Sequence, residues 1–288
     1  MRKAYLITIS SFLIFFSMFL LVDYYYIWNA RVEGHIAETK HLDKVPYIFD
    51  DVQYSMRGAM ETQLEFDSSE GVFVVRFDDF IPAATDIQET LSEYETFLET
   101  EYANENNVDI EFDQTDFISD PRITFTNGLV YNYTSLNKTG VFFHGGGSHT
   151  SAVEIKILAD KQWNSTDANW NWDPSGNIDV VLDIRDSTDQ QLSINGSVSG
   201  KVNSDENNTA VFNFIQEGTR TPAFRISLGN VDAKEGSVKI EQIELVSFES
   251  DLTVNTTNYG PVRAQLPVKL NVSNELVNVH GPVILEEL

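Results

Sequence analysis

An uninterrupted apolar segment near the start of the chain constrains its fold more than any other feature. Residues 4–22 read AYLITISSFLIFFSMFLLV, nineteen positions without a charge. As a helix this segment would be about 29 Å long, close to the hydrocarbon core of a bilayer, about 30 Å. It is preceded by Arg2 and Lys3 and followed by Asp23, Tyr24, Tyr25, Tyr26 and Trp28. Basic residues before a span and aromatic residues after it predict a single-pass anchor in the lipid bilayer, with a cytoplasmic N-terminus and the bulk of the chain outside the cell membrane.

A cleaved secretory signal is the alternative to a retained anchor. The flank after Val22 lacks the small residues of a cleavage site, which favours retention. The junction Arg2-Lys3-Ala4, followed by the apolar helix, resembles the start of archaeal type IV pilins. This resemblance covers only the N-terminal segment and implies processing near Ala4 and self-assembly into a filament. The glutamate that many pilins carry early in the mature helix is missing from Tyr5–Ser10.

Charge and cysteine content narrow the classes of partner. The chain of 288 residues has 44 acidic and 19 basic residues, a formal net charge of −25, and no cysteine. Such a charge repels nucleic acid, so nucleic acid is not an expected partner. The absence of cysteine excludes disulfides, zinc–thiolate sites and cysteine nucleophiles. An acidic surface without disulfides is typical of an exported archaeal protein in concentrated salt; simple solubility outside the cell is the alternative.

The first half of the chain after the anchor predicts a helical stalk and a small α+β domain. We expect the stalk over residues 23–45, ended by Pro46, and the domain over residues 46–143. A hairpin is predicted over residues 63–80, and a helix from Thr85, where T-x-x-Q forms a capping box. Asn127-Gly128 between two short apolar runs predicts a second hairpin.

The second half predicts an antiparallel β-sandwich over residues 151–288, joined to the first domain by a glycine-rich linker at residues 144–150. Apolar and polar residues alternate around positions 155, 182, 226 and 268, which indicates strands with one buried face. In residues 238–248 the alternation slips, which predicts a bulge. Residues 224–229 and 236–245 resemble the closing strands of carbohydrate-binding jelly rolls. That resemblance implies a jelly-roll topology and surface glycans as ligands.

One loop carries the candidate ligand-binding residues. Asp167, Asn169, Asn171 and Asp173 place oxygen atoms at alternate positions, as in the first half of a calcium loop, although Trp172 and Ile178 replace the Gly and Glu of an EF-hand. Trp163, Trp170 and Trp172 could stack on sugar rings. A loop packed over the end of the sandwich is the alternative. Ca²⁺ is the one cofactor that this pattern suggests.

Seven N-x-[ST] sequons agree with an extracytoplasmic position. They are Asn132, Asn137, Asn164, Asn195, Asn207, Asn255 and Asn271. Catalysis is not expected: His144-Gly145-Gly146-Gly147 looks like an esterase oxyanion loop, but no G-x-S-x-G accompanies it. The sequence therefore predicts a membrane-anchored surface glycoprotein that binds other surface molecules or has a structural role, with a pilin-like filament subunit and a calcium-stabilised carbohydrate-binding module as alternatives.

Overall fold

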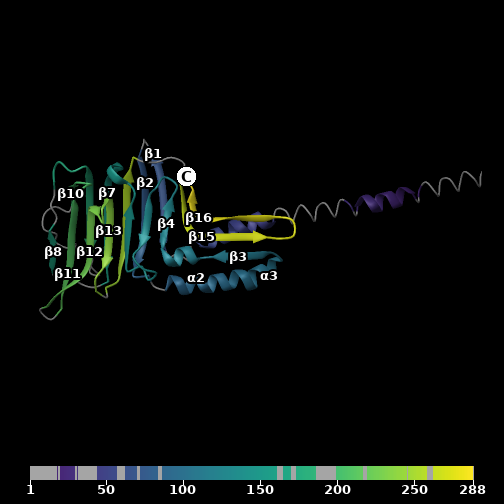
Figure 1. The fold of residues 1–288 in the computed structure, drawn as a ribbon, viewed down its shortest axis with the longest axis horizontal. Helices are drawn as coiled ribbons and strands as arrows, with labels where there is room; N and C mark the ends of the chain where they lie inside the picture. Colours follow the sequence, from purple (N-terminus) through teal and green to yellow (C-terminus); the bar gives the residue numbers. More distant parts are fainter. Residues whose placement is uncertain are drawn as a thin grey trace, which may run out of the picture.

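The computed structural model shows a β-sandwich with few helices (Figure 1). The described residues are 18, 20–29, 31, 44–56, 62–69, 72–83, 86–160, 165–169, 173–185, 199–216, 219–244, 246–257 and 262–287. The predicted mainly-β fold class is confirmed for this part of the chain.

The first sheet contains six strands. In spatial order they are β1 (Thr62–Ser69), β2 (Val72–Ile81), β14 (Phe248–Thr256), β7 (Thr150–Ala159), β9 (Ile178–Arg185) and β10 (Ser199–Val202). β1 and β2 form the predicted hairpin, in which Ser69 faces Val72. β7 and β9 run parallel, so the sheet departs from the fully antiparallel prediction. A parallel pair needs a crossover connection, and here the chain passes through β8 of the other sheet.

The second sheet is larger. Its main path is β16 (Asn278–Glu287), β15 (Arg263–Ser273), β4 (Arg122–Phe125), β5 (Val130–Tyr133), β6 (Gly140–His144), β13 (Lys234–Gln242), β12 (Thr219–Val231), β11 (Asn207–Gln216) and β8 (Ser165–Asn169). β3 (Asp109–Asp113) pairs with the distal half of β15. The predicted Asn127-Gly128 turn joins β4 to β5, and Gly128 adopts a φ of 90°, which glycine tolerates at no steric cost.

Both sheets combine strands from before and after the glycine-rich segment 144–150. β2 pairs with β14, β6 pairs with β13, and β4 pairs with β15. The segment 144–150 carries the chain from β6 in one sheet to β7 in the other. It therefore connects the two sheets of one sandwich, whereas the sequence pattern predicts a linker between two domains there. Pairing between strands so far apart leaves no local signal in the sequence.

A second crossover replaces the predicted bulge in residues 238–248. β13 ends at Gln242 in the larger sheet, and β14 begins at Phe248 in the smaller one. Val246, between them, is buried in the core. The slip in alternation thus marks the place where the chain changes sheets.

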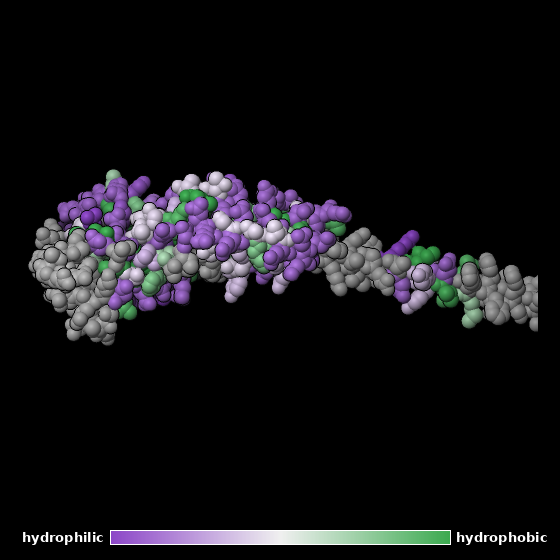
Figure 2. Space-filling view, turned by 90° about the horizontal axis from the view of Figure 1, so that it is seen from below, coloured by the Kyte–Doolittle hydropathy of each residue, from purple (hydrophilic) through white to green (hydrophobic). Residues whose placement is uncertain are grey.

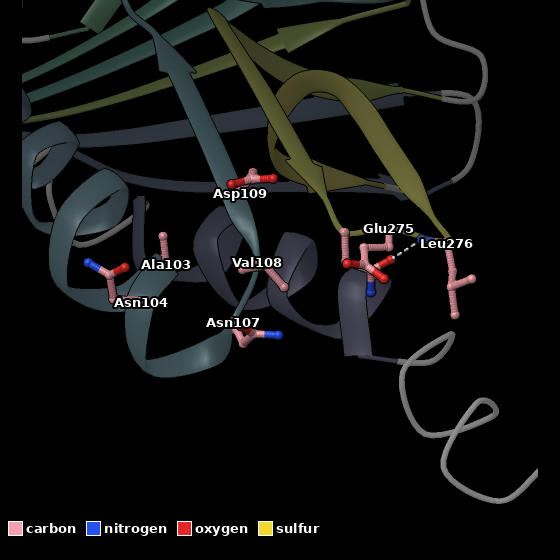
Figure 3. A pocket seen from close by; sticks show the side chains of 8 residues that line it. Ala103, Asn104, Asn107, Val108, Asp109, Glu275 and Leu276 are labelled. Carbon is pink, nitrogen blue, oxygen red and sulfur yellow. Dashed lines mark hydrogen bonds between the residues drawn. The ribbon is translucent and has the colours of Figure 1, made fainter. Parts of the chain in front are cut away.

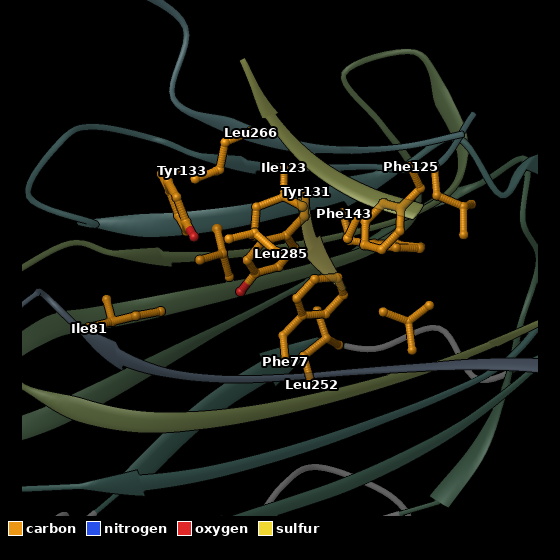
Figure 4. Packing of buried hydrophobic residues seen from close by; sticks show 14 of the residues in the cluster. Phe77, Ile81, Ile123, Phe125, Tyr131, Tyr133, Phe143, Leu252, Leu266 and Leu285 are labelled. Carbon is orange, nitrogen blue, oxygen red and sulfur yellow. The ribbon is translucent and has the colours of Figure 1, made fainter. Parts of the chain in front are cut away.

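The apolar faces of the two sheets enclose one hydrophobic core. Its residues come from almost every strand and form a single cluster. Figure 4 shows Phe77 and Leu252 of the smaller sheet facing Tyr131 and Phe143 of the larger one. The rings of Phe77 and Tyr131 stack with centroids 3.8 Å apart and planes at 8°. The apolar residues of the alternating sequence pattern therefore point into this core throughout the sandwich.

Helices gather at one end of the molecule. α2 (Ile87–Thr96) continues through a π-helical turn (Phe97–Tyr102) into α3 (Ala103–Asn106), and α4 (Thr115–Ser119) is a short helix that the sequence analysis missed. α2 begins at Ile87, because the Asp86 side chain caps it by accepting a hydrogen bond from the Gln88 N–H at 2.9 Å. The predicted cap, Thr85, lies outside the described residues.

A further helix, residues 44–56, packs into this end of the molecule. Val45, Ile48, Val52 and Met56 are buried at helical spacing. Gln53 Oε1 accepts a hydrogen bond from the backbone N–H of Ile284 on β16 at 3.3 Å. Pro46 lies in the first turn of the described part of this helix, where proline is tolerated. Residues 32–43 lie outside the described residues, so the end of the stalk at Pro46 stays a prediction.

Residues 20–29 form a helix whose side chains are all exposed. Figure 1 shows it apart from the sandwich, and Figure 2 shows hydrophobic side chains on it while hydrophilic ones cover most of this face of the sandwich. Most of the predicted anchor, residues 4–22, lies outside the described residues. Within the described ranges no helix is both long and apolar enough to cross a membrane.

Candidate functional site

Most of the predicted calcium and tryptophan loop lies outside the described residues. This holds for Trp163, Trp170, Asn171 and Trp172. Asp167 and Asn169 belong to β8, where their backbones pair with Val211 and Thr209 of β11. The loop therefore includes an edge strand of the larger sheet, which the sequence analysis did not predict.

Asp173, the last of the predicted calcium ligands, holds a tight turn. Its carboxylate accepts hydrogen bonds from the Ser175 N–H at 2.8 Å, the Ser175 hydroxyl at 2.7 Å and the Asn203 amide at 2.8 Å. These bonds lower the pKa of the Asp173 carboxyl. In the described part of the chain no three His, Asp or Glu side chains are grouped as metal ligands.

The sequons occupy different environments. Asn137 and Asn207 are exposed; Asn132, Asn255 and Asn271 are half-buried within strands; Asn164 and Asn195 lie outside the described residues. The Asn132 side chain is already engaged, since its oxygen lies 3.0 Å from His144 Nε2 and its amide donates to Asp120 at 3.3 Å. Asn137 and Asn207 are therefore the described sequons best placed to carry a glycan.

The outer face of the larger sheet has a polar hollow that the sequence patterns do not predict. Side chains from β11, β12 and β13 line it, together with the turn after β12, and its volume is about 440 Å³. The lining residues include Asn207, Thr209, Arg225, Ser227, Asp232, Lys239 and Glu241. We call this feature the β11–β13 hollow.

Opposite charges alternate along the β11–β13 hollow. Lys239 Nζ lies 2.9 Å from Glu241 and 3.2 Å from Asp232, and Arg225 lies 3.8 Å from the other oxygen of Glu241. Burial alone would lower the pKa of Lys239, but its bonds to the two carboxylates outweigh burial and raise that pKa. Two basic residues thus meet on one face of a strongly acidic protein.

Neutral polar groups and one aromatic ring complete this face. Thr209 Oγ1 lies 3.0 Å from Ser227 Oγ, and both hydroxyls border the hollow. The ring of Phe142 lies 5.8 Å from Lys239 Nζ. The hydroxyls, the amide and the paired charges can hydrogen-bond a polyhydroxylated ligand, and an aromatic ring can pack against its apolar face. They do not form a nucleophile–base pair of the kind that catalysis requires.

His144 extends the polar face beyond the hollow. Burial lowers the pKa of its imidazole, and the nearby Lys234 and Arg122 cations lower it further. The sequence pattern predicts a linker that begins at His144, but His144 is the last residue of β6 and its side chain is half-buried. Neutral His144 therefore holds Asn132 by a hydrogen bond at physiological pH.

A second hollow lies at the helical end of the molecule. It has a volume of about 450 Å³ and lies between the end of α3 and the turn joining β15 to β16 (Figure 3). Its polar groups are Asn104, Asn107, Asp109, Asn274 and Glu275, while Leu276 beside them is 60% exposed. Asn274 Oδ1 accepts from the Leu276 N–H at 2.9 Å and fixes the turn. None of the described residues that line this hollow is basic.

Comparisons of the chain with protein-family models, curated proteins and solved structures found no match. The site is therefore judged on its geometry. One sequence signal could have located the residues of the β11–β13 hollow. The alternation identifies the buried residues of β12 and β13, so the residues between them, at positions 225, 227, 239 and 241, must point to the outer face of the sheet. What alternation cannot give is that β11, β12 and β13 are neighbours.

Proposed function

We propose that this protein is a membrane-anchored, extracytoplasmic surface protein with a binding or structural role and no catalytic activity. The observation that carries the proposal is the helix at residues 20–29. Leu20, Leu21, Val22, Ile27 and Trp28 are 47–69% exposed there. Apolar and aromatic side chains left in water at this density indicate a surface that another apolar phase covers.

The helix at residues 44–56 supports the proposal by linking such an anchor to the sandwich. Val45, Ile48, Val52 and Met56 are at most 1% exposed. Tyr102 OH donates to Asp51 at 2.5 Å, and Tyr94 OH donates to the carbonyl of Val52 at 3.3 Å, so the helix is also held by hydrogen bonds on its flank. The sandwich would therefore be mounted on the membrane through a packed helix.

The test of the anchor is protease treatment of intact cells that produce the full chain. We expect cleavage of the sandwich from outside, with the N-terminal remnant left in a membrane fraction that detergent extracts and salt does not. Phe15→Arg, at the centre of the apolar segment, should abolish retention, because a charge at the bilayer centre costs about 2.5–3.5 kcal/mol. Tyr47→Arg, at a 71% exposed helix position, is the matched control. A protected sandwich in intact cells would contradict the proposal.

A pilin-like filament subunit is the second candidate. It is favoured by the aromatic residues of the exposed helix: Tyr24, Tyr25 and Tyr26 are 60–75% exposed and could pack between copies of the chain. Shearing whole cells separates the two outcomes. Recovery of the protein in sheared filaments, with the N-terminus trimmed near Ala4, would favour the filament subunit, and retention in the membrane with residues 1–22 intact would favour the anchored surface protein.

For the binding role, we infer polyhydroxylated surface glycans as the ligand class of the β11–β13 hollow. The hydroxyls of Thr209 and Ser227 beside paired charges support this, as does the resemblance of residues 224–229 and 236–245 to carbohydrate-binding jelly rolls. A glycan array probed with the full chain, with and without Ca²⁺, tests it. Arg225→Ala should weaken any signal, whereas Arg76→Ala, an exposed arginine of the other sheet, should not. Absence of binding in both conditions would remove glycans from the proposal.

A further inference from the structure

A lysine and an aspartate meet inside the sandwich. Lys138 Nζ lies 3.0 Å from Asp79 Oδ1, and the two side chains are 1% and 0% exposed. Asp79 belongs to β2 in the smaller sheet, and Lys138 lies in the turn between β5 and β6 in the larger sheet. Lysine is almost never fully buried without a specific reason.

The turn holds Lys138 in place. Its backbone N–H donates to the Ser135 carbonyl at 3.0 Å, and Lys138 adopts a φ of 45°, which is uncommon outside glycine. The carbonyl of Asn137 accepts from the Ala83 N–H at 2.9 Å, which fixes the turn to the chain after β2. Both partners of the pair are therefore positioned by backbone contacts and not only by mutual attraction.

Aromatic rings surround the pair and keep water out. Lys138 Nζ lies 5.0 Å from the centre of the Tyr133 ring. Tyr131 OH donates a hydrogen bond to Oδ2 of Asp79, and its ring stacks on Phe77. Figure 4 shows Tyr131, Tyr133, Phe77 and Ile81 together in this part of the core. Separated charges are poorly stabilised in such surroundings, which favours any neutral product of the pair.

We propose that Lys138 and Asp79 condense to an intramolecular isopeptide bond. The ammonium passes one proton to the carboxylate, which leaves a neutral amine beside a neutral acid. The amine nitrogen then attacks the side-chain carbonyl carbon of Asp79, the C–N bond forms, and one C–O bond breaks. The nitrogen loses two protons in all, and the departing oxygen takes both and leaves as water. The step needs no oxidant, reductant or further reactant.

Tyr131 is suited to assist this step. Its phenol donates to the carboxyl oxygen that does not face Lys138, so it polarises the carbonyl and stabilises the negative charge that develops on that oxygen during the attack. Burial, followed by the charge of Asp79, raises the pKa of Tyr131 well above its usual value and keeps the phenol protonated. The fold already holds the amine close to the acid, so the reaction does not lose the translational and rotational entropy that a bimolecular reaction loses.

The bond would join the two sheets covalently. It would close a loop between residues separated by 59 positions, in a chain that has no cysteine for a disulfide. It would therefore perform the cross-linking role of a disulfide in an exported protein. This inference is independent of the proposed function, since it concerns the core and not the anchor or the β11–β13 hollow.

Mass spectrometry of the denatured full chain tests the bond. We expect an intact mass lower by one water than the sequence requires, and after proteolysis a branched peptide that joins the segments containing Asp79 and Lys138. Lys239 and Glu241 provide an internal control: they lie 2.9 Å apart, but both are partly exposed, and their peptides should be linear. Only linear peptides with free Lys138 and Asp79, or a water loss within a linear peptide, would overturn the proposal.

Variants sharpen the test. Asp79→Ala should restore the full mass of its own sequence. Asp79→Asn should lose ammonia in place of water and give the same final mass as the linked natural chain, because both routes produce the same amide. Tyr131→Phe should slow formation and leave a measurable unlinked fraction after expression. If Asp79→Ala fails to fold, the peptides of the natural chain still decide the outcome.

Discussion

Replacing Leu252 by alanine probes whether the two halves of the chain form one folding unit. Leu252 is 1% exposed on β14 and pairs with Phe77 on one side and with Ile155 on the other. β2 precedes the glycine-rich segment and β7 follows it. The substitution therefore leaves a cavity where strands from both halves meet.

The expected loss of stability follows from the size of that cavity. Leu→Ala substitutions in well-packed cores cost about 2–5 kcal/mol, which combines lost transfer free energy with the cavity left behind. Leu252 lies at the centre of a sheet whose neighbours are fixed by backbone pairing on both sides, so the site has little room to collapse. We expect a value near the middle of the range, about 3 kcal/mol, a large part of a typical stability of about 5–15 kcal/mol.

Hydrogen exchange in low denaturant, read peptide by peptide, is the assay. The protection of peptides from β2 and from β9 should fall by the same free energy, and near-UV and far-UV circular dichroism should give one coincident transition. Val181→Ala on β9, whose side chain is 44% exposed, is a matched control and should change stability little. Loss of protection confined to residues after 150, with β2 unchanged, would refute the single sandwich core.

Three further predictions concern the helix and two titrating groups. Ile48→Ala should lower the free energy of unfolding by about 2–4 kcal/mol in a urea titration, because it removes a buried contact of the helix at residues 44–56, and Tyr47→Ala in the same helix should have little effect. The His144 ring should titrate below pH 6.5 in an NMR pH series, since burial and two nearby cations lower its pKa; its contribution to stability is then present above pH 6.5 and is lost as the pH falls from there to the folded-state pKa. The Asp173 carboxyl should titrate below pH 3.8, so its contribution to stability is present above that pH and disappears as the pH falls through the folded-state pKa. Ser175→Ala removes the hydroxyl that donates to this carboxylate and should move the NMR titration midpoint back up. A midpoint for either group at or above its ordinary value would contradict the hydrogen bonds and burial described for it.

Strands from both halves of the chain contribute residues to the core, which explains why a chain with two sequence patterns forms one sandwich. Before residue 144 strands and helices alternate, whereas the described residues after it contain strands and one short 3-10 helix, Gly147–His149. The first pattern indicates an α+β domain and the second a separate sandwich. β2 nevertheless lies between β1 and β14, so its inward face, including Phe77, packs on the same core as the later strands.

Local chemistry by itself determined much of the secondary structure. Period-two alternation identified the buried faces of β7, β9, β12 and β15, because successive side chains of a strand point to opposite faces. Asn127-Gly128 placed a turn, since glycine accepts the positive φ that the turn needs. The apolar run of residues 4–22 and the net charge of −25 are likewise properties of the sequence, from which the membrane anchor and the exclusion of nucleic acid remain predictions.

Only the tertiary structure decided which strands are neighbours. The positions of the β11–β13 hollow and of the Lys138–Asp79 pair depend on that pairing. The β11–β13 hollow exists because the outward phases of three strands align, and the Lys138–Asp79 pair exists because a turn of one sheet reaches a strand of the other. In the sequence, Asp79 is one of 44 acidic residues and Lys138 is the middle residue of a sequon. The physical reason is that alternation depends on the backbone of one strand, whereas strand pairing depends on the packing of side chains far apart in the chain.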